Sequence, residues 1–232
     1  EPSQWIHLLV MAVLVTLFVM SLRNMDLTLR VADIQTLTYL VLYAFAGFLA
    51  SSLALRFVFQ MISLEGKQFW SLLSSPIDVK KVYHTKFIIA FLFMLLVAEL
   101  VAVFTNMPFV RMSERRPLLM YFGVFSAFWI SLAMASLNLG FGSYFANFTE
   151  KNPIRVSSSQ GATLTFLISL VFLITLVVVV ILPLTSYFES LYIFTAFDNR
   201  MIIIPGILLY VFSILLAAFA FLVGIRSLKR DF

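Results

Sequence analysis

The residues able to do chemistry in this sequence are few and widely spaced. There are only two histidines, His7 and His84, and no cysteine, so thiolate nucleophiles, disulfides and Cys/His metal clusters lack their side chains. A phosphate-binding loop needs G-x-x-x-x-G-K-[ST], and the Gly-Lys pair at 66–67 lacks both the upstream glycine and the following hydroxyl residue. The Gly-Ser pair at 142–143 lacks the flanking pattern of an intramembrane serine hydrolase. We therefore predict no catalytic residue, no metal and no enzymatic activity on this chain.

Polar side chains inside apolar runs are functional candidates by default. Glu99 lies well inside such a run, where it is a candidate to bind a cationic substrate or relay protons. The alternative is that Glu99 lies near the outer interface, bonded to a neighbouring helix or to water. Asn138 is a second candidate for a polar position along a pathway. Arg56 is expected to extend its side chain to the lipid headgroups.

Composition places all of these residues in a membrane protein. The chain is 62% hydrophobic and 12% charged, whereas soluble domains are about 45–50% apolar and about a quarter charged. A water-soluble fold of 232 residues has no way to bury that much apolar surface. The net charge of +5 is read as a signal of orientation in the bilayer, not as a site for nucleic acid.

The apolar runs predict an all-α fold with six transmembrane helices, because lipid leaves no partner for exposed backbone groups. We place the spans at about 5–22, 36–62, 82–104, 118–148, 162–184 and 201–225, in one domain covering 1–232. The aromatic stretch 186–200 suits a short segment in the outer interface. The opening "EPSQWIHLLV" has no Met, so we expect a fragment of a longer chain or one that lost its start.

Loop charges orient the spans. With both termini in the cytoplasm, the inner side holds ten of the Lys and Arg residues and the outer side six, which agrees with the positive-inside rule. Small residues also recur four apart, as in Ala46-Ala50-Ala54 and Ala127-Ser131-Ala135. Such stripes let helices approach closely, either within one subunit or between two.

The polar segment between the second and third spans has its own pattern. In "EGKQFWSLLSS", Phe69, Leu72 and Leu73 fall at i, i+3 and i+4 and form one apolar face. This predicts a short amphipathic helix on the cytoplasmic surface. Pro76 ends it, since proline disfavours helical geometry in the preceding residue.

Two stretches resemble a known family. "SLEGKQFWSLLSSPIDVKKVYHTKF" (63–87) and "LNLGFGSYFANFTEKNPIRVSSSQG" (137–161) are similar to permease subunits of type-2-class ATP-binding-cassette (ABC) exporters, closest to a bacterial group of ABC exporters. The second stretch departs from that group at Ala146 and Gln160, where proline and a small residue are expected. The resemblance implies a multi-pass protein of the bacterial inner membrane that couples ATP hydrolysis to translocation of a substrate.

The resemblance also implies partners and roles. A cytoplasmic ABC ATPase subunit would carry ATP and Mg²⁺, this chain would hold no cofactor, and a second permease half would complete the pathway in the lipid bilayer. The segment between spans two and three would be a coupling helix that docks on the ATPase, with these residues as its coupling set: Glu65, Gly66, Phe69, Trp70, Leu72, Leu73 and Pro76. The alternative is an ATPase-independent secondary carrier, or a substrate-binding membrane subunit, that uses Glu99.

Overall fold

The computed structural model describes residues 9–10, 13–18, 20–21, 31–68, 78–112, 118–150, 152–193, 197–198 and 200–230. These residues form helices and connecting turns and contain no strand. The principal helices are α2 (Ala32–Leu53), α4 (Val79–Met112), α5 (Leu118–Tyr144), α7 (Gln160–Ile193) and α8 (Arg200–Arg230). The end of α2 continues through a π-helical turn η1 (Ala54–Val58) and two 3-10 segments, η2 (Phe59–Met61) and η3 (Ser63–Gln68). A short helix α6 (Pro153–Ser157) precedes α7.

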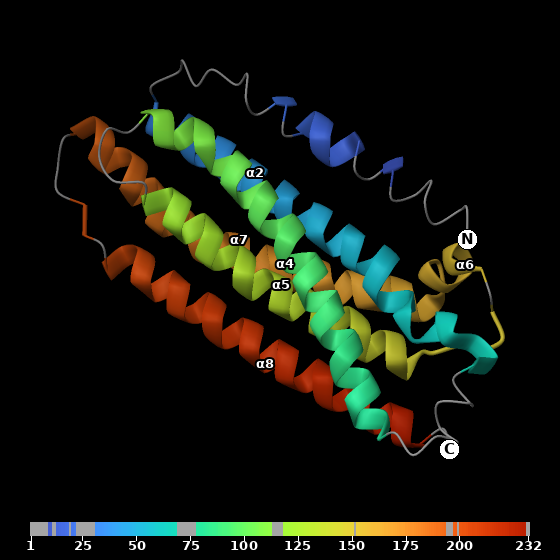
Figure 1. Cartoon of the computed structure of the whole chain (residues 1–232). Coiled ribbons are helices and arrows are strands. Elements are labelled where there is room, and N and C mark those ends of the chain that lie inside the picture. The colour runs from blue at the N-terminus through green and yellow to red at the C-terminus, as the bar shows by residue number, and fades with distance from the viewer. Residues whose placement is uncertain are drawn as a thin grey trace.

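The long helices lie side by side as an elongated bundle, and successive ones run in opposite directions (Figure 1). Helix α5 occupies the centre, packed chiefly against α8 and α4, while α2 packs mainly against α7. The segment η3, the start of α4, helix α6 and the end of α8 all lie at one end of the bundle (Figure 1). We call this the basic end, for reasons given below.

The all-helical prediction is confirmed, and the count of six spans is not. The described part of the chain has five helices long and apolar enough to cross a membrane, within 32–66, 79–110, 118–144, 160–193 and 200–228. They correspond to the second to sixth predicted spans. Of the predicted first span, 5–22, the structure describes 9–10, 13–18 and 20–21, and these residues are helical.

Two predicted spans end later than expected, and each contains a proline. The third span was expected to end near 104, but α4 continues through Pro108 to Met112. Helix α7 likewise continues through Pro183 to Ile193, so residues 186–193 belong to a long helix and not to a separate interfacial segment. Membrane helices tolerate proline because neighbouring groups and local adjustments satisfy the freed carbonyls.

The small residues bring helices of this same chain together. A Cβ on Gly140 of α5 would lie 2.1 Å from the backbone oxygen of Ala220 in α8, and one on Gly142 would lie 2.1 Å from the oxygen of Phe59. Earlier in α5, Ser131 Oγ donates to the carbonyl oxygen of Met94 in α4 at 3.3 Å. In α2, Gly47 packs against Leu173 of α7. Each of these contacts is intramolecular.

We expect Gly140→Ala to lower the free energy of unfolding by about 1–3 kcal/mol, because the new methyl group meets backbone that has no rotamer to change. Gly206→Ala is the matched control, since its Cβ would lie 3.7 Å from the nearest atom, Cε1 of Phe125. Thermal unfolding of the purified chain in detergent measures both. Equal melting temperatures for the two variants would contradict the close contact between α5 and α8.

Candidate functional site

Positive charge gathers at the end of the bundle that holds η3, α6, the start of α4 and the end of α8. The opposite end has acidic residues at Asp33, Glu189 and Asp198 and one described cationic side chain, Arg200. The described cationic side chains of the basic end are Arg56, Lys80, Lys81, Lys86, Arg155 and Arg226. These statements cover the described side chains, and those of Arg23, Arg30, Arg111, Arg115 and Arg116 lie outside them.

A partly buried ion pair joins η3 to α4 at the basic end. The Lys86 ammonium forms a salt bridge with Glu65, and the two side chains are 15% and 29% exposed. The same ammonium donates to the carbonyl oxygen of Met61 at 3.0 Å. Because this pair is screened less than an exposed one, removing one partner leaves a charge without compensation.

The same segment is tied to the chain that follows α5. The backbone N–H of Asn147 donates to Oγ of Ser63 at 3.1 Å. Gly66 has φ 52° and ψ −137°, a conformation that favours glycine, and a Cβ there would lie 3.6 Å from the oxygen of Phe148. The turn after α2 therefore contacts both α4 and the end of α5.

Two residues of the predicted coupling set, Glu65 and Gly66, thus lie where three segments meet. The other members, Phe69, Trp70, Leu72, Leu73 and Pro76, lie outside the described residues. The amphipathic helix predicted over 65–75 is not confirmed, because its described part, 65–68, lies in a 3-10 segment interrupted at Gly66. The coupling role itself stays a prediction.

The two predicted pathway residues are not brought together. Asn138 is fully buried in α5, where its Nδ2 donates to the oxygen of Met134 at 2.9 Å. Glu99 is half-buried in α4. The Ser131–Met94 contact sets the register of these antiparallel helices, and Asn138 and Glu99 lie on opposite sides of it, about 18 Å apart along the bundle axis at 1.5 Å per residue.

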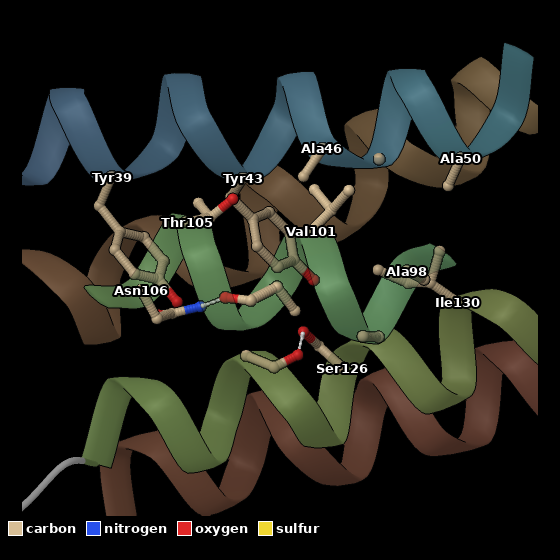
Figure 2. A pocket seen from close by; sticks show the side chains of 14 residues that line it. Tyr39, Tyr43, Ala46, Ala50, Ala98, Val101, Thr105, Asn106, Ser126 and Ile130 are labelled. Atoms are coloured by element: carbon tan, nitrogen blue, oxygen red, sulfur yellow. Dashed lines mark hydrogen bonds between the residues drawn. The ribbon is translucent and has the colours of Figure 1, made fainter. Parts of the chain in front are cut away.

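The polar cluster that the sequence did not indicate lies between α2, α4 and α5 (Figure 2). Tyr39 and Tyr43 of α2 face Thr105 and Asn106 of α4 across a cavity of about 40 Å³, and Ser126 of α5 lines the same cavity. Four of the buried oxygens have no partner within the described part of the chain: the hydroxyls of Tyr39, Tyr43 and Thr105 and Oδ1 of Asn106. A cavity of this size with several polar partners fits ordered water.

The Asn106 side chain fits against α5 because Gly123 has no side chain there. Its Nδ2 donates to the oxygen of Ala102 at 2.8 Å, and a Cβ on Gly123 of α5 would lie 2.2 Å from that nitrogen. Sequence reasoning ended the third span at 104 and so placed Thr105 and Asn106 outside the membrane. The available signal was the apolar pair Phe109-Val110 after Pro108, which continues the run.

One family model matches almost the full length of the sequence. Residues 1–231 match the model of a family described as "Putative ATP-binding cassette". The chain belongs to this family. No curated protein and no solved structure matches it.

This family corrects two predictions made from the resemblance. Its description names the ATP-binding cassette itself, so the identification of the chain as a permease subunit of a type-2-class exporter is contradicted. The prediction that the chain has no ATPase activity and leaves ATP to a partner is contradicted on the same ground. Membership of the ABC family and the transmembrane character of the helices stand. The five helices are compatible with a multi-pass membrane protein.

The described residues lack the features of a P-loop cassette. A cassette of the P-loop type cradles phosphate with backbone N–H groups between a strand and a helix. The 232 residues contain no G-x-x-x-x-G-K-[ST] sequence, and the described ones form helices without strands. What the structure describes is therefore a helical, membrane-type portion of an ABC-family protein.

We expect Thr105→Val to leave the free energy of unfolding unchanged or to raise it by up to about 1 kcal/mol. The change replaces a buried hydroxyl that has no partner in the described residues with a methyl group of similar shape. Ser131→Ala is the contrast, because it removes a hydroxyl bonded to Met94 and Ala127 and should destabilise. Unfolding in detergent measures both. Clear destabilisation by Thr105→Val would show that its hydroxyl is bonded, for instance to water.

Proposed function

We propose that this chain is a membrane-embedded component of an ABC transporter, in which ATP hydrolysis is coupled to translocation of a substrate. Family membership across residues 1–231 supports the link to ATP, and five apolar helices support the membrane location. The observation that carries the coupling is the Glu65–Lys86 pair, which joins the turn after α2 to the start of α4. A push on η3 is passed directly to a transmembrane helix through this contact.

The basic end is suited to receive such a push. The turn bearing Glu65 contacts α4 through Lys86 and the end of α5 through the Ser63–Asn147 hydrogen bond. A displacement of this turn therefore acts on α4 and on the central helix together. We propose that Glu65 and Gly66 act with the following residues as the transmission element: Phe69, Trp70, Leu72, Leu73 and Pro76.

The proposal also covers the pairing of the bundle, its orientation and the route of the substrate. A second copy or homologous half pairs with this bundle in the bilayer, the basic end faces the bacterial cytoplasm, and the substrate passes between the two halves. Glu99 and Asn138 are candidate polar positions along that route. Because they lie at different depths, they would meet a substrate in succession rather than together.

The coupling contact is tested by exchanging its charges. We expect Glu65→Lys or Lys86→Glu alone to abolish ATP-dependent movement at the basic end, because each places like charges side by side, and the double exchange to restore it. Since the chain has no cysteine, spin labels on Lys81→Cys and Ser158→Cys report this movement as a distance change on adding Mg-ATP and vanadate to the intact transporter.

The control for this experiment is the Glu150–Arg155 pair, whose Arg155 side chain is 76% exposed and lies 3.7 Å from Glu150. Its charge exchange should leave the movement unchanged, because exposed pairs contribute little. Single variants at Glu65 or Lys86 that respond to ATP like the wild type would remove the coupling role.

The ATP link itself has a separate test. In proteoliposomes the labelled transporter should respond to Mg-ATP and not to a proton or sodium gradient, and Glu99→Gln should leave that response intact. A response to an ion gradient that is lost in Glu99→Gln would instead establish the secondary carrier. ATP hydrolysis by the purified chain, measured in the same preparation, shows whether the activity belongs to this chain.

A further inference from the structure

A second cavity lies near the basic end, apart from the polar cluster of Figure 2. It has a volume of about 360 Å³ and is formed by the end of α2 with η1 and η2 on one side, and by α6 and the start of α7 on the other. We call it the Arg56 pocket. Its lining residues are Ser52, Leu55, Arg56, Phe57, Gln60, Pro153, Ile154, Ser157, Ser158 and Phe166.

The charge in this pocket is positive and uncompensated. Among the described residues that line it, Arg56 is the only charged one. The salt bridges in the described part of the chain join Lys86 to Glu65 and Arg155 to Glu150, and neither involves Arg56. Arg56 is half-buried within the π-helical turn η1, a feature that occurs frequently at functional sites. A half-buried guanidinium with no salt bridge among the described residues is available to pair with an anionic group.

Neutral polar groups surround the guanidinium. Ser52 and Gln60 line the pocket beside Arg56. Gln60 is 5% exposed, and its Oε1 is buried without a hydrogen-bond partner in the described residues. Ser157 Oγ and Ser158 Oγ already donate to the oxygen of Ile154. The Arg56 guanidinium and the Ser52 hydroxyl are therefore the donors that line the pocket. Arginine pairs with phosphate oxygens through two parallel hydrogen bonds.

The rest of the pocket is apolar. Leu55, Phe57, Ile154 and Phe166 line it, and the ring of Phe166 packs edge-on against Phe48 at 5.9 Å. Of these residues, Ile154 is 44% exposed, so the apolar side of the pocket reaches the surface of the protein. A ligand with an anionic head and a hydrocarbon tail satisfies both halves of the site. A small hydrated anion satisfies only one.

We propose that the Arg56 pocket binds the phosphate of an anionic amphiphile, such as a membrane phospholipid, with the phosphate on Arg56 and Ser52 and the acyl chain along Phe166 and α7. The location suits this ligand, because Arg56 lies at the basic end of α2, where lipid headgroups meet the apolar helix surface. The assignment does not depend on the proposed transport function.

The test uses the purified full chain in a neutral detergent and follows its thermal unfolding. Titration with dioleoyl phosphatidylglycerol should raise the melting temperature saturably, since a ligand that binds only the folded state stabilises it. Arg56→Gln should weaken the apparent affinity at least about tenfold through loss of charged hydrogen bonds. Lys81→Gln, which removes an exposed charge at the same end, should leave the affinity unchanged.

Two further variants keep the test decisive if Arg56→Gln does not fold. Arg56→Lys keeps the charge without the planar fork and should bind with intermediate affinity. Ser158→Glu places a carboxylate at the exposed rim of the pocket and should weaken binding by repulsion without entering the core. Wild-type affinity in Ser158→Glu, or equal weakening in Lys81→Gln, would overturn the site.

Other ligands separate the possible sources of phosphate. Dioleoyl phosphatidylcholine, inorganic phosphate and Mg-ATP are each titrated in the same way, and each should shift the melting temperature less than phosphatidylglycerol. An equal shift with inorganic phosphate or Mg-ATP would overturn the amphiphile as the ligand. An equal shift with phosphatidylcholine would overturn the role of the uncompensated charge.

Discussion

Helix α5 touches backbone on two sides, at Gly140 against Ala220 of α8 and at Gly142 against Phe59 of η2. No side chain larger than hydrogen fits at either point, so these contacts determine how closely the neighbouring helices approach. In lipid, where burial of apolar surface no longer drives association, such close packing is the main attraction between helices. The position of α8, and of the turn that carries Glu65, both follow from it.

Polar interactions are distributed unevenly over this frame. At the basic end they are satisfied between segments, through Glu65–Lys86 and Ser63–Asn147. Inside the bundle they are not, since the hydroxyls of Tyr39, Tyr43 and Thr105 face a small cavity without partners in the described residues. The satisfied contacts at the basic end hold segments together. Unpartnered buried hydroxyls lower stability, and proteins retain such groups where they serve a function. The Arg56 pocket brings one charged side chain together with polar and apolar side chains from both of its walls.

Much of the fold was predictable, and the exceptions have physical causes. Long apolar runs must be helical in lipid, so five of the expected spans appear with shifted ends. The third and fifth spans were expected to end near 104 and 184, yet their helices continue through Pro108 to Met112 and through Pro183 to Ile193, because proline in a membrane bundle is tolerated by its surroundings. Glu65 and Gly66 were placed in a candidate site and do meet other segments there. The family match overturned the resemblance to a permease subunit. Two short motifs indicate a local structure, but they do not identify the subunit that carries it.

The sequence by itself determined that the chain is apolar enough for lipid and that its fold is helical. It also determined that cationic residues cluster between particular spans and that few side chains suit catalysis. Each follows from composition or from spacing along one helix, which is local information. Only the tertiary structure decided that Asn106 meets Gly123, that Arg56 has no salt bridge within the described residues, and that Glu99 and Asn138 lie at different depths. These facts depend on the register and rotation of one helix against another, and such contacts arise from packing between residues far apart in the chain.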